Sequence, residues 1–127
     1  MSKITKAISI RAPWWWYIFR AGKDVENRSW RTNFRGRIYI HASRWWSDRE
    51  LDEGDWPVVF SQKDLDRMKP RGGHIVGSVE IVDCIDDSKS KWAQDGFWHF
   101  VLRDPKPLRT PVPVIGKVGI FNVEGSL

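Results

Sequence analysis

The sequence predicts an α+β fold in which five or six short strands form a small, partly closed β-barrel with two or three short helices. Apolar residues recur at strand spacing in several short stretches that are bounded by Gly, Pro, Asn or Asp, whereas helical spacing is confined to brief segments. These helices are too few and too short for the crossovers of a parallel sheet. A chain of 127 residues can bury its own core, so we expect one domain over residues 1–127.

The first part of the chain is predicted to run strand, helix, strand. Residues 6–10 alternate as a strand does, and Pro13 follows at a position where a helix can begin without losing an N–H donor. The helix is predicted over 14–21, with Gly22 as its stop, and both of its faces are apolar. Such a helix either packs on two sides or has one side beneath a ligand. Residues 25–30 are predicted to be extended.

The later elements are predicted from turn residues and strand patterns. Ser61 and Asp64 have the spacing of a capping box, which predicts that a helix begins there. The predicted elements are a turn over 33–36, a strand over 37–42, a charged helix or loop over 43–54, a helix over 61–68, strands over 74–85 and 97–103, a proline-rich crossover over 105–113 and a last strand over 118–123.

Charge is divided unevenly along the chain. Residues 1–49 hold 11 Lys and Arg against 3 Asp and Glu, a net charge of +8, whereas residues 50–127 hold 10 against 13, a net charge of −3. A basic first half suits an anionic partner. A solvated basic face is the alternative interpretation, and charge alone does not separate the two.

Several classes of protein are disfavoured by what the sequence lacks. Cys84 is the single cysteine, so we expect a buried, inert thiol and neither an internal disulfide nor a cysteine-based zinc site. We see no signal peptide and no apolar run of membrane-spanning length, which indicates a cytoplasmic protein that does not enter the membrane.

No cofactor or metal is predicted either, since phosphate-loop and dinucleotide glycine patterns are missing. His41, His74 and His99 are far apart in sequence, and hydrogen-bonded structural histidines are expected at His41 and His99.

Lys23, Glu26 and Arg28 form the sharpest constellation of charged residues. As a binding device, the two cations would contact phosphates or a base edge while Glu26 accepts from an exocyclic amine. As a catalytic device, Lys23 could act as a base or nucleophile with Glu26 as its partner. A purely structural ion-pair lattice is the third interpretation. Alternation over 25–30 would point Glu26, Arg28 and Trp30 the same way.

Nine tryptophans are too many for the core of so small a domain. Trp14, Trp30 and Trp98 are candidate platforms for a stacked base, because aromatic faces beside guanidinium groups suit a base and its phosphate. Core packing is the alternative for each of them. The sequence assigns no role to Trp45, Trp46 or Trp56.

Motifs along nearly the whole chain resemble the ASCH domain family, a branch of the PUA-like superfamily. They are Ser9-Ile-Arg11, Pro13-Trp14, the run from Gly22 to Thr32, Arg35-Gly36, Ile40-His41-Ala42, Gly73-x-Ile75-Val76-Gly77, Val79-Glu80, Trp98 and Gly116-Lys117-x-Gly119-Ile120-Phe121. The resemblance implies a PUA-like pseudo-barrel whose cleft binds RNA or a single modified base. Carried over, the cleft would be lined by Ser9, Arg11, Trp14, Lys23, Glu26, Arg28 and Trp30, with His41 and Trp98 nearby.

Activities within this family diverge, and the leading hypothesis here is binding of a nucleic acid or a modified nucleotide, above all RNA, by a monomer. Arg31 and Arg35 would join Arg11, Lys23 and Arg28 on phosphates. The second hypothesis is a metal-independent ribonuclease or an amidohydrolase acting on a modified nucleoside. Lys23 matches the lysine of an amidohydrolase branch, but Glu26 stands where that branch has a threonine. A protein-interaction module with exposed tryptophans is the third hypothesis.

Overall fold

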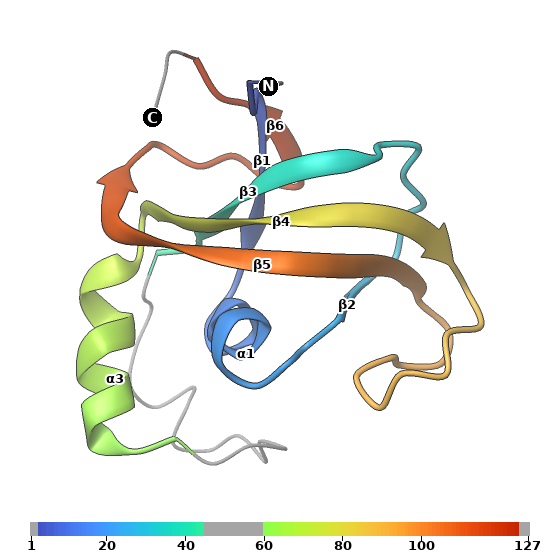
Figure 1. Cartoon of the computed structure of the whole chain (residues 1–127), viewed down its shortest axis with the longest axis horizontal. Helices are drawn as coiled ribbons and strands as arrows, with labels where there is room; N and C mark the ends of the chain where they lie inside the picture. Colours follow the sequence, from blue (N-terminus) through green and yellow to red (C-terminus); the bar gives the residue numbers. More distant parts are fainter. Residues whose placement is uncertain (1–2, 45–59, 125–127) are drawn as a thin grey trace.

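The strands form one curled sheet in the order β2-β5-β4-β3-β1-β6 in a computed structural model that describes residues 3–44 and 60–124 (Figure 1). The strands are β1 (Lys6–Ile10), β2 (Val25–Arg28), β3 (Gly36–Ala42), β4 (His74–Ile85), β5 (Trp98–Pro113) and β6 (Ile120–Asn122). The helices are α1 (Trp14–Arg20), α3 (Gln62–Met68) and the 3-10 turn η1 (Lys69–Arg71). The predicted class, a small α+β fold with a PUA-like, partly closed barrel, is confirmed.

Neighbouring strands are antiparallel except for β1 and β3, which pair in parallel with Ile8 opposite Ile40. The connection between these two strands contains α1 and β2, so a seven-residue helix suffices for one crossover that the sequence did not lead us to expect. In Figure 1, α1 lies on the concave side of the sheet, between β1 and β2. This position brings the start of α1 close to the one edge strand that carries the charged constellation.

The prediction of a proline-rich crossover over 105–113 is wrong, because these residues continue β5. Strand β2 accompanies β5 only as far as Val101, so beyond that point β5 pairs with β4 on one side alone among the described residues. Proline has no N–H to donate and is tolerated where a strand edge is open. The same residues that looked like a connection therefore extend the long central hairpin.

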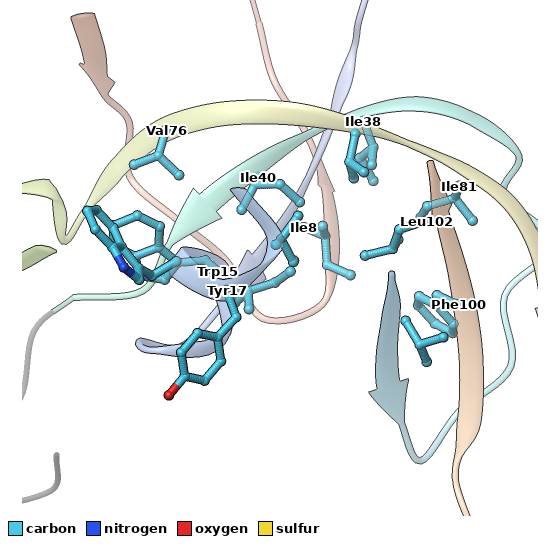
Figure 2. Close-up of a cluster of buried hydrophobic side chains, with 14 of the residues drawn as sticks. Ile8, Trp15, Tyr17, Ile38, Ile40, Val76, Ile81, Phe100 and Leu102 are labelled. Carbon is cyan, nitrogen blue, oxygen red and sulfur yellow. The ribbon is translucent and has the colours of Figure 1, made fainter. Parts of the chain in front are cut away.

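The core is an apolar cluster between the sheet and α1 (Figure 2). Helix α1 buries Trp15, Trp16, Tyr17 and Ile18, which confirms that it packs on more than one side. Its first residue, Trp14, packs against this cluster but is only partly buried.

Two local predictions are also confirmed. Ser61 and Asp64 form a reciprocal capping box at the start of α3, in which each side chain accepts from the other residue's backbone N–H. Cys84 is a buried free thiol. No helix within the described ranges is long and apolar enough to cross a bilayer. Most of the predicted segment 43–54, including Trp45 and Trp46, lies outside the described residues, and so does Trp56.

Replacing Gly77 with alanine should destabilise the fold by about 2 kcal/mol, since overpacking a core usually costs 1–3 kcal/mol. A Cβ at this position would lie 2.5 Å from the Phe19 ring and 2.7 Å from the Lys106 carbonyl oxygen, which is backbone and cannot turn aside. Urea unfolding measures the change. Thr110→Ala, on an exposed part of β5, is the control and should stay within about 0.5 kcal/mol of the parent. Equal stabilities for the two variants would contradict this packing.

Candidate functional site

A buried carboxylate, Glu26, holds two cations at once. Lys23 Nζ lies 3.0 Å from Glu26 Oε1, and Arg28 donates to Glu26 Oε2 from Nε at 3.2 Å and from Nη2 at 2.9 Å. Only 3% of Lys23 and 7% of Glu26 are exposed. The constellation predicted from sequence is therefore one ion-pair group with the carboxylate at its centre.

The alternation of β2 explains half of this geometry. Residues two apart on a strand face the same way, so Glu26 and Arg28 lie on one face of β2. Arg28 Nη2 also donates to the backbone oxygen of Ser9 at 2.6 Å, which ties β2 to β1 although the two strands are not neighbours in the sheet.

The turn after α1 supplies the other half. Gly22 takes a left-handed backbone conformation, with φ of 71°, that glycine adopts more readily than other residues. The N–H of Lys23 then donates to the Tyr17 carbonyl oxygen at 3.1 Å, and Lys23 Nζ donates to the Val25 carbonyl oxygen as well as to Glu26. Lys23 is thus directed back toward the first turn of α1 and away from solvent.

The ion-pair group lines a cleft of about 290 Å³. Pockets for small ligands begin at roughly 300 Å³, so this cleft has room for one base-sized group rather than for a folded segment. Its lining residues are Ser9, Ile10, Arg11, Trp14, Lys23, Glu26, Asn27, Arg28, Trp92 and Gln94. Six of the seven residues that the family resemblance placed in the cleft are among them.

Trp14 gives the cleft an aromatic wall. Its ring meets Tyr17 edge to face, with centroids 5.8 Å apart, and Lys23 Nζ lies 5.9 Å from the Trp14 ring centroid. The ring is partly exposed, so one aromatic surface and three cationic side chains, Arg11, Lys23 and Arg28, border the same small volume.

Trp30, the seventh residue, does not line this cleft. Its side chain leans on Phe100, with ring centroids 5.1 Å apart, and is 37% exposed. The Arg31 guanidinium lies 5.8 Å from the Trp98 ring centroid, and Trp98 stands opposite Arg28 in the β2–β5 ladder. Directly opposed residues lie on the same face of the sheet, so the surface formed by Trp30, Arg31 and Trp98 adjoins Arg28.

Arg35 is held by local contacts instead. It donates to the Thr32 and Phe34 carbonyl oxygens and lies 3.5 Å from Asp83.

His41 lies in a second hollow, which is larger, at about 700 Å³, and more open. Its Nε2 is 2.7 Å from the Val114 carbonyl oxygen and its Nδ1 is 3.4 Å from Ser9 Oγ, while Ser9 Oγ donates to the Lys117 carbonyl oxygen at 2.8 Å. The prediction of a structural, hydrogen-bonded histidine is confirmed here, and for His99 by its contacts with Gln94 and Ser88. The described lining of the second hollow contains no tryptophan, whereas the smaller cleft combines Trp14 with the ion-pair group, so the smaller cleft is the better candidate site.

Sequence reasoning missed four lining residues, Ile10, Asn27, Trp92 and Gln94. Asn27 Nδ2 donates to the Trp92 carbonyl oxygen and Asn27 Oδ1 accepts from the Gln94 N–H, both at 2.9 Å. These bonds hold the loop after β4 against the edge strand β2. Nothing in the loop's own pattern could have placed Trp92 in the cleft, and the excess of tryptophan was the only hint.

This curled six-stranded sheet, with a cation-bordered cleft beside its short first helix, defines a PUA-like β-barrel protein. The family model of the ASCH domain matches residues 8–100, so the chain belongs to the ASCH domain family. The resemblance stated from motifs is thereby confirmed.

Two relatives are human and mouse activating signal cointegrator 1. Each is 25% identical to this chain over 130 residues, and the match covers 94% of the chain. The chain spans 22% of the length of either relative, so what those larger proteins do as a whole does not transfer to it directly.

Glu26→Gln should lower the free energy of unfolding by about 3 kcal/mol, because it leaves Lys23 charged, buried and without its carboxylate. Chemical denaturation of the purified variant measures this. Asp104→Asn removes a carboxylate from the exposed pair with Arg37 and should cost at most about 1 kcal/mol. If the two substitutions cost the same, the Glu26 ion pairs do not hold the site together.

Proposed function

We propose that the cleft binds one nucleotide unit of a nucleic acid, RNA in the first instance. The observation that carries this proposal is the ion-pair group of Lys23, Glu26 and Arg28 beside the partly exposed ring of Trp14. A base can stack on the indole, and the phosphate or sugar attached to it lies within the field of the cations.

Charge in and around the cleft supports an anionic guest. Three cationic residues, Arg11, Lys23 and Arg28, line it with the single carboxylate of Glu26. Glu26 neutralises one charge and fixes the direction of two side chains, so the cations are positioned before a guest arrives. Binding to a preordered site costs less entropy than binding to mobile side chains.

The surface formed by Trp30, Arg31 and Trp98 extends the proposed interface. It adjoins Arg28 through the β2–β5 ladder and offers exposed aromatic area with a stacked guanidinium. We propose that nucleotides flanking the one in the cleft lie along it. Arg35 and His41, which do not line the cleft, stay predictions as contacts.

An enzyme is the second candidate, since Lys23 and Glu26 are 3.0 Å apart in the cleft, as an acid–base pair would need to be. In the ion pair, however, Lys23 is an ammonium with no lone pair to attack or to accept a proton, which favours binding. Labelled single-stranded RNA and N4-acetylcytidine incubated with the protein in EDTA test the alternative. Product that disappears in both Lys23→Ala and Glu26→Gln would favour it.

Arg11→Ala should weaken binding of a labelled single-stranded RNA about 5-fold and reduce the slope of log K against log salt by about 0.7, the loss expected for one phosphate contact on a single strand. Fluorescence anisotropy between low and moderate salt measures both. Arg109→Ala removes the same charge from an exposed part of β5 outside the cleft lining and is the control. Identical effects of the two substitutions would indicate a general charge effect and no phosphate at the cleft.

Trp14→Ala should weaken binding of both a mononucleotide and an RNA oligonucleotide by about 10-fold, since stacking on an aromatic side chain contributes about 1–3 kcal/mol per base. Trp98→Ala should weaken only the oligonucleotide, because Trp98 lies outside the cleft. Titration calorimetry on the two ligands gives the comparison. A mononucleotide that binds the Trp14 variant undiminished would remove Trp14 from the site.

A further inference from the structure

One polar atom of a cleft-lining residue has no partner. Trp92 is 7% exposed, and its indole Nε1 is the one buried side-chain nitrogen or oxygen among residues 3–44 and 60–124 that lacks a hydrogen-bond partner. An unmet buried donor costs about 1–3 kcal/mol, and native proteins rarely keep one without a use. Trp92 lines the same cleft as Lys23, Glu26 and Arg28.

The loop around Trp92 is fixed by contacts that do not involve the indole N–H. The Trp92 carbonyl oxygen accepts from Asn27 Nδ2, its backbone N–H donates to Ser90 Oγ, and its ring lies 5.4 Å from that of Tyr17. Ser90 Oγ in turn donates to Asp24 beside β2. The indole is therefore held in place before any ligand arrives.

The acceptors that Glu26 and Asn27 contribute to the cleft already have partners. Both oxygens of Glu26 take N–H groups from Lys23 and Arg28, and Asn27 Oδ1 takes the Gln94 N–H. Lys23 donates to two oxygens, so the third proton of its ammonium group is left for a guest. The Trp92 indole N–H can also donate but cannot accept. A guest with an amino group on its edge would meet donors, whereas a guest with a carbonyl oxygen would satisfy them.

From this accounting we infer that the cleft selects a base with a carbonyl edge, of the uracil type, and that Trp92 is the residue that determines this specificity by donating its indole N–H to the carbonyl oxygen. A pyrimidine also suits a cleft of about 290 Å³. The inference rests on the proposed function, since it presumes that a nucleotide occupies the cleft. It reverses the role that the sequence suggested for Glu26, whose carboxylate positions cations instead of reading an exocyclic amine.

The test compares uridine 5′-monophosphate with cytidine 5′-monophosphate, which differ by a carbonyl or an amine at ring position 4 and by an N–H donor or a nitrogen acceptor at position 3. Calorimetry on the parent protein should show uridine monophosphate binding about 10-fold more tightly, a difference of about 1.4 kcal/mol. Trp92→Phe keeps a ring against Tyr17 but removes the N–H, and it should reduce the preference to about 2-fold or less. Trp16→Phe, in α1 and outside the cleft lining, is the matched control and should keep the full preference.

A spectroscopic readout on the unaltered protein guards against a variant that fails to fold. In a ¹H–¹⁵N NMR spectrum, the Trp92 indole N–H resonance should shift on addition of uridine monophosphate and stay in place with cytidine monophosphate. Equal affinities for the two nucleotides, or an unmoved Trp92 resonance while single-stranded RNA binds, would overturn the inference and leave the proposed function standing. Binding of neither mononucleotide nor RNA would overturn both.

Discussion

Burial of the Glu26 carboxylate is the constraint on which the site depends. A charge withdrawn from water must be matched by charges and donors nearby, and here Lys23 and Arg28 supply three N–H groups to its two oxygens. Those cations are anchored in turn to the backbone of β2 and β1. These ion pairs and hydrogen bonds thus join β2, the turn after α1 and β1. Strands β1 and β2 are not neighbours in the sheet, so no ladder hydrogen bonds connect them.

This arrangement separates the roles of charge in the cleft. The oxygens of Glu26 accept from the protein's own cations, so the groups of the ion pair that remain for the proposed nucleotide are cationic and donate hydrogen bonds. A site of this kind attracts an anion from a distance and orients it at contact, and the two effects depend differently on salt. The aromatic surface of Trp14 adds attraction that salt does not screen.

The adjoining surface of Trp30, Arg31 and Trp98 has a different character. Trp30 and Arg31 are exposed in the turn after β2 and Trp98 is partly buried on β5, whereas the cleft is recessed beside α1. A recessed site suits recognition of one base, while an exposed stacking surface tolerates any base. Their adjacency through the Arg28–Trp98 pair would let a single strand engage both, with selectivity confined to the cleft.

Local chemistry in the sequence determined much of this protein. Alternation placed Glu26 and Arg28 on one face of β2, the Ser61–Asp64 spacing determined the start of α3, and the motif pattern identified the family. What the sequence could not determine depended on neighbours: whether prolines after Val101 faced a partner strand, whether Trp30 joined the cleft, and which loop closed it. Only the tertiary structure brought Trp92 to the cleft. The Asn27 side chain donates one hydrogen bond to the loop and accepts another from it, between residues about 65 positions apart, and no local pattern encodes a contact of that range.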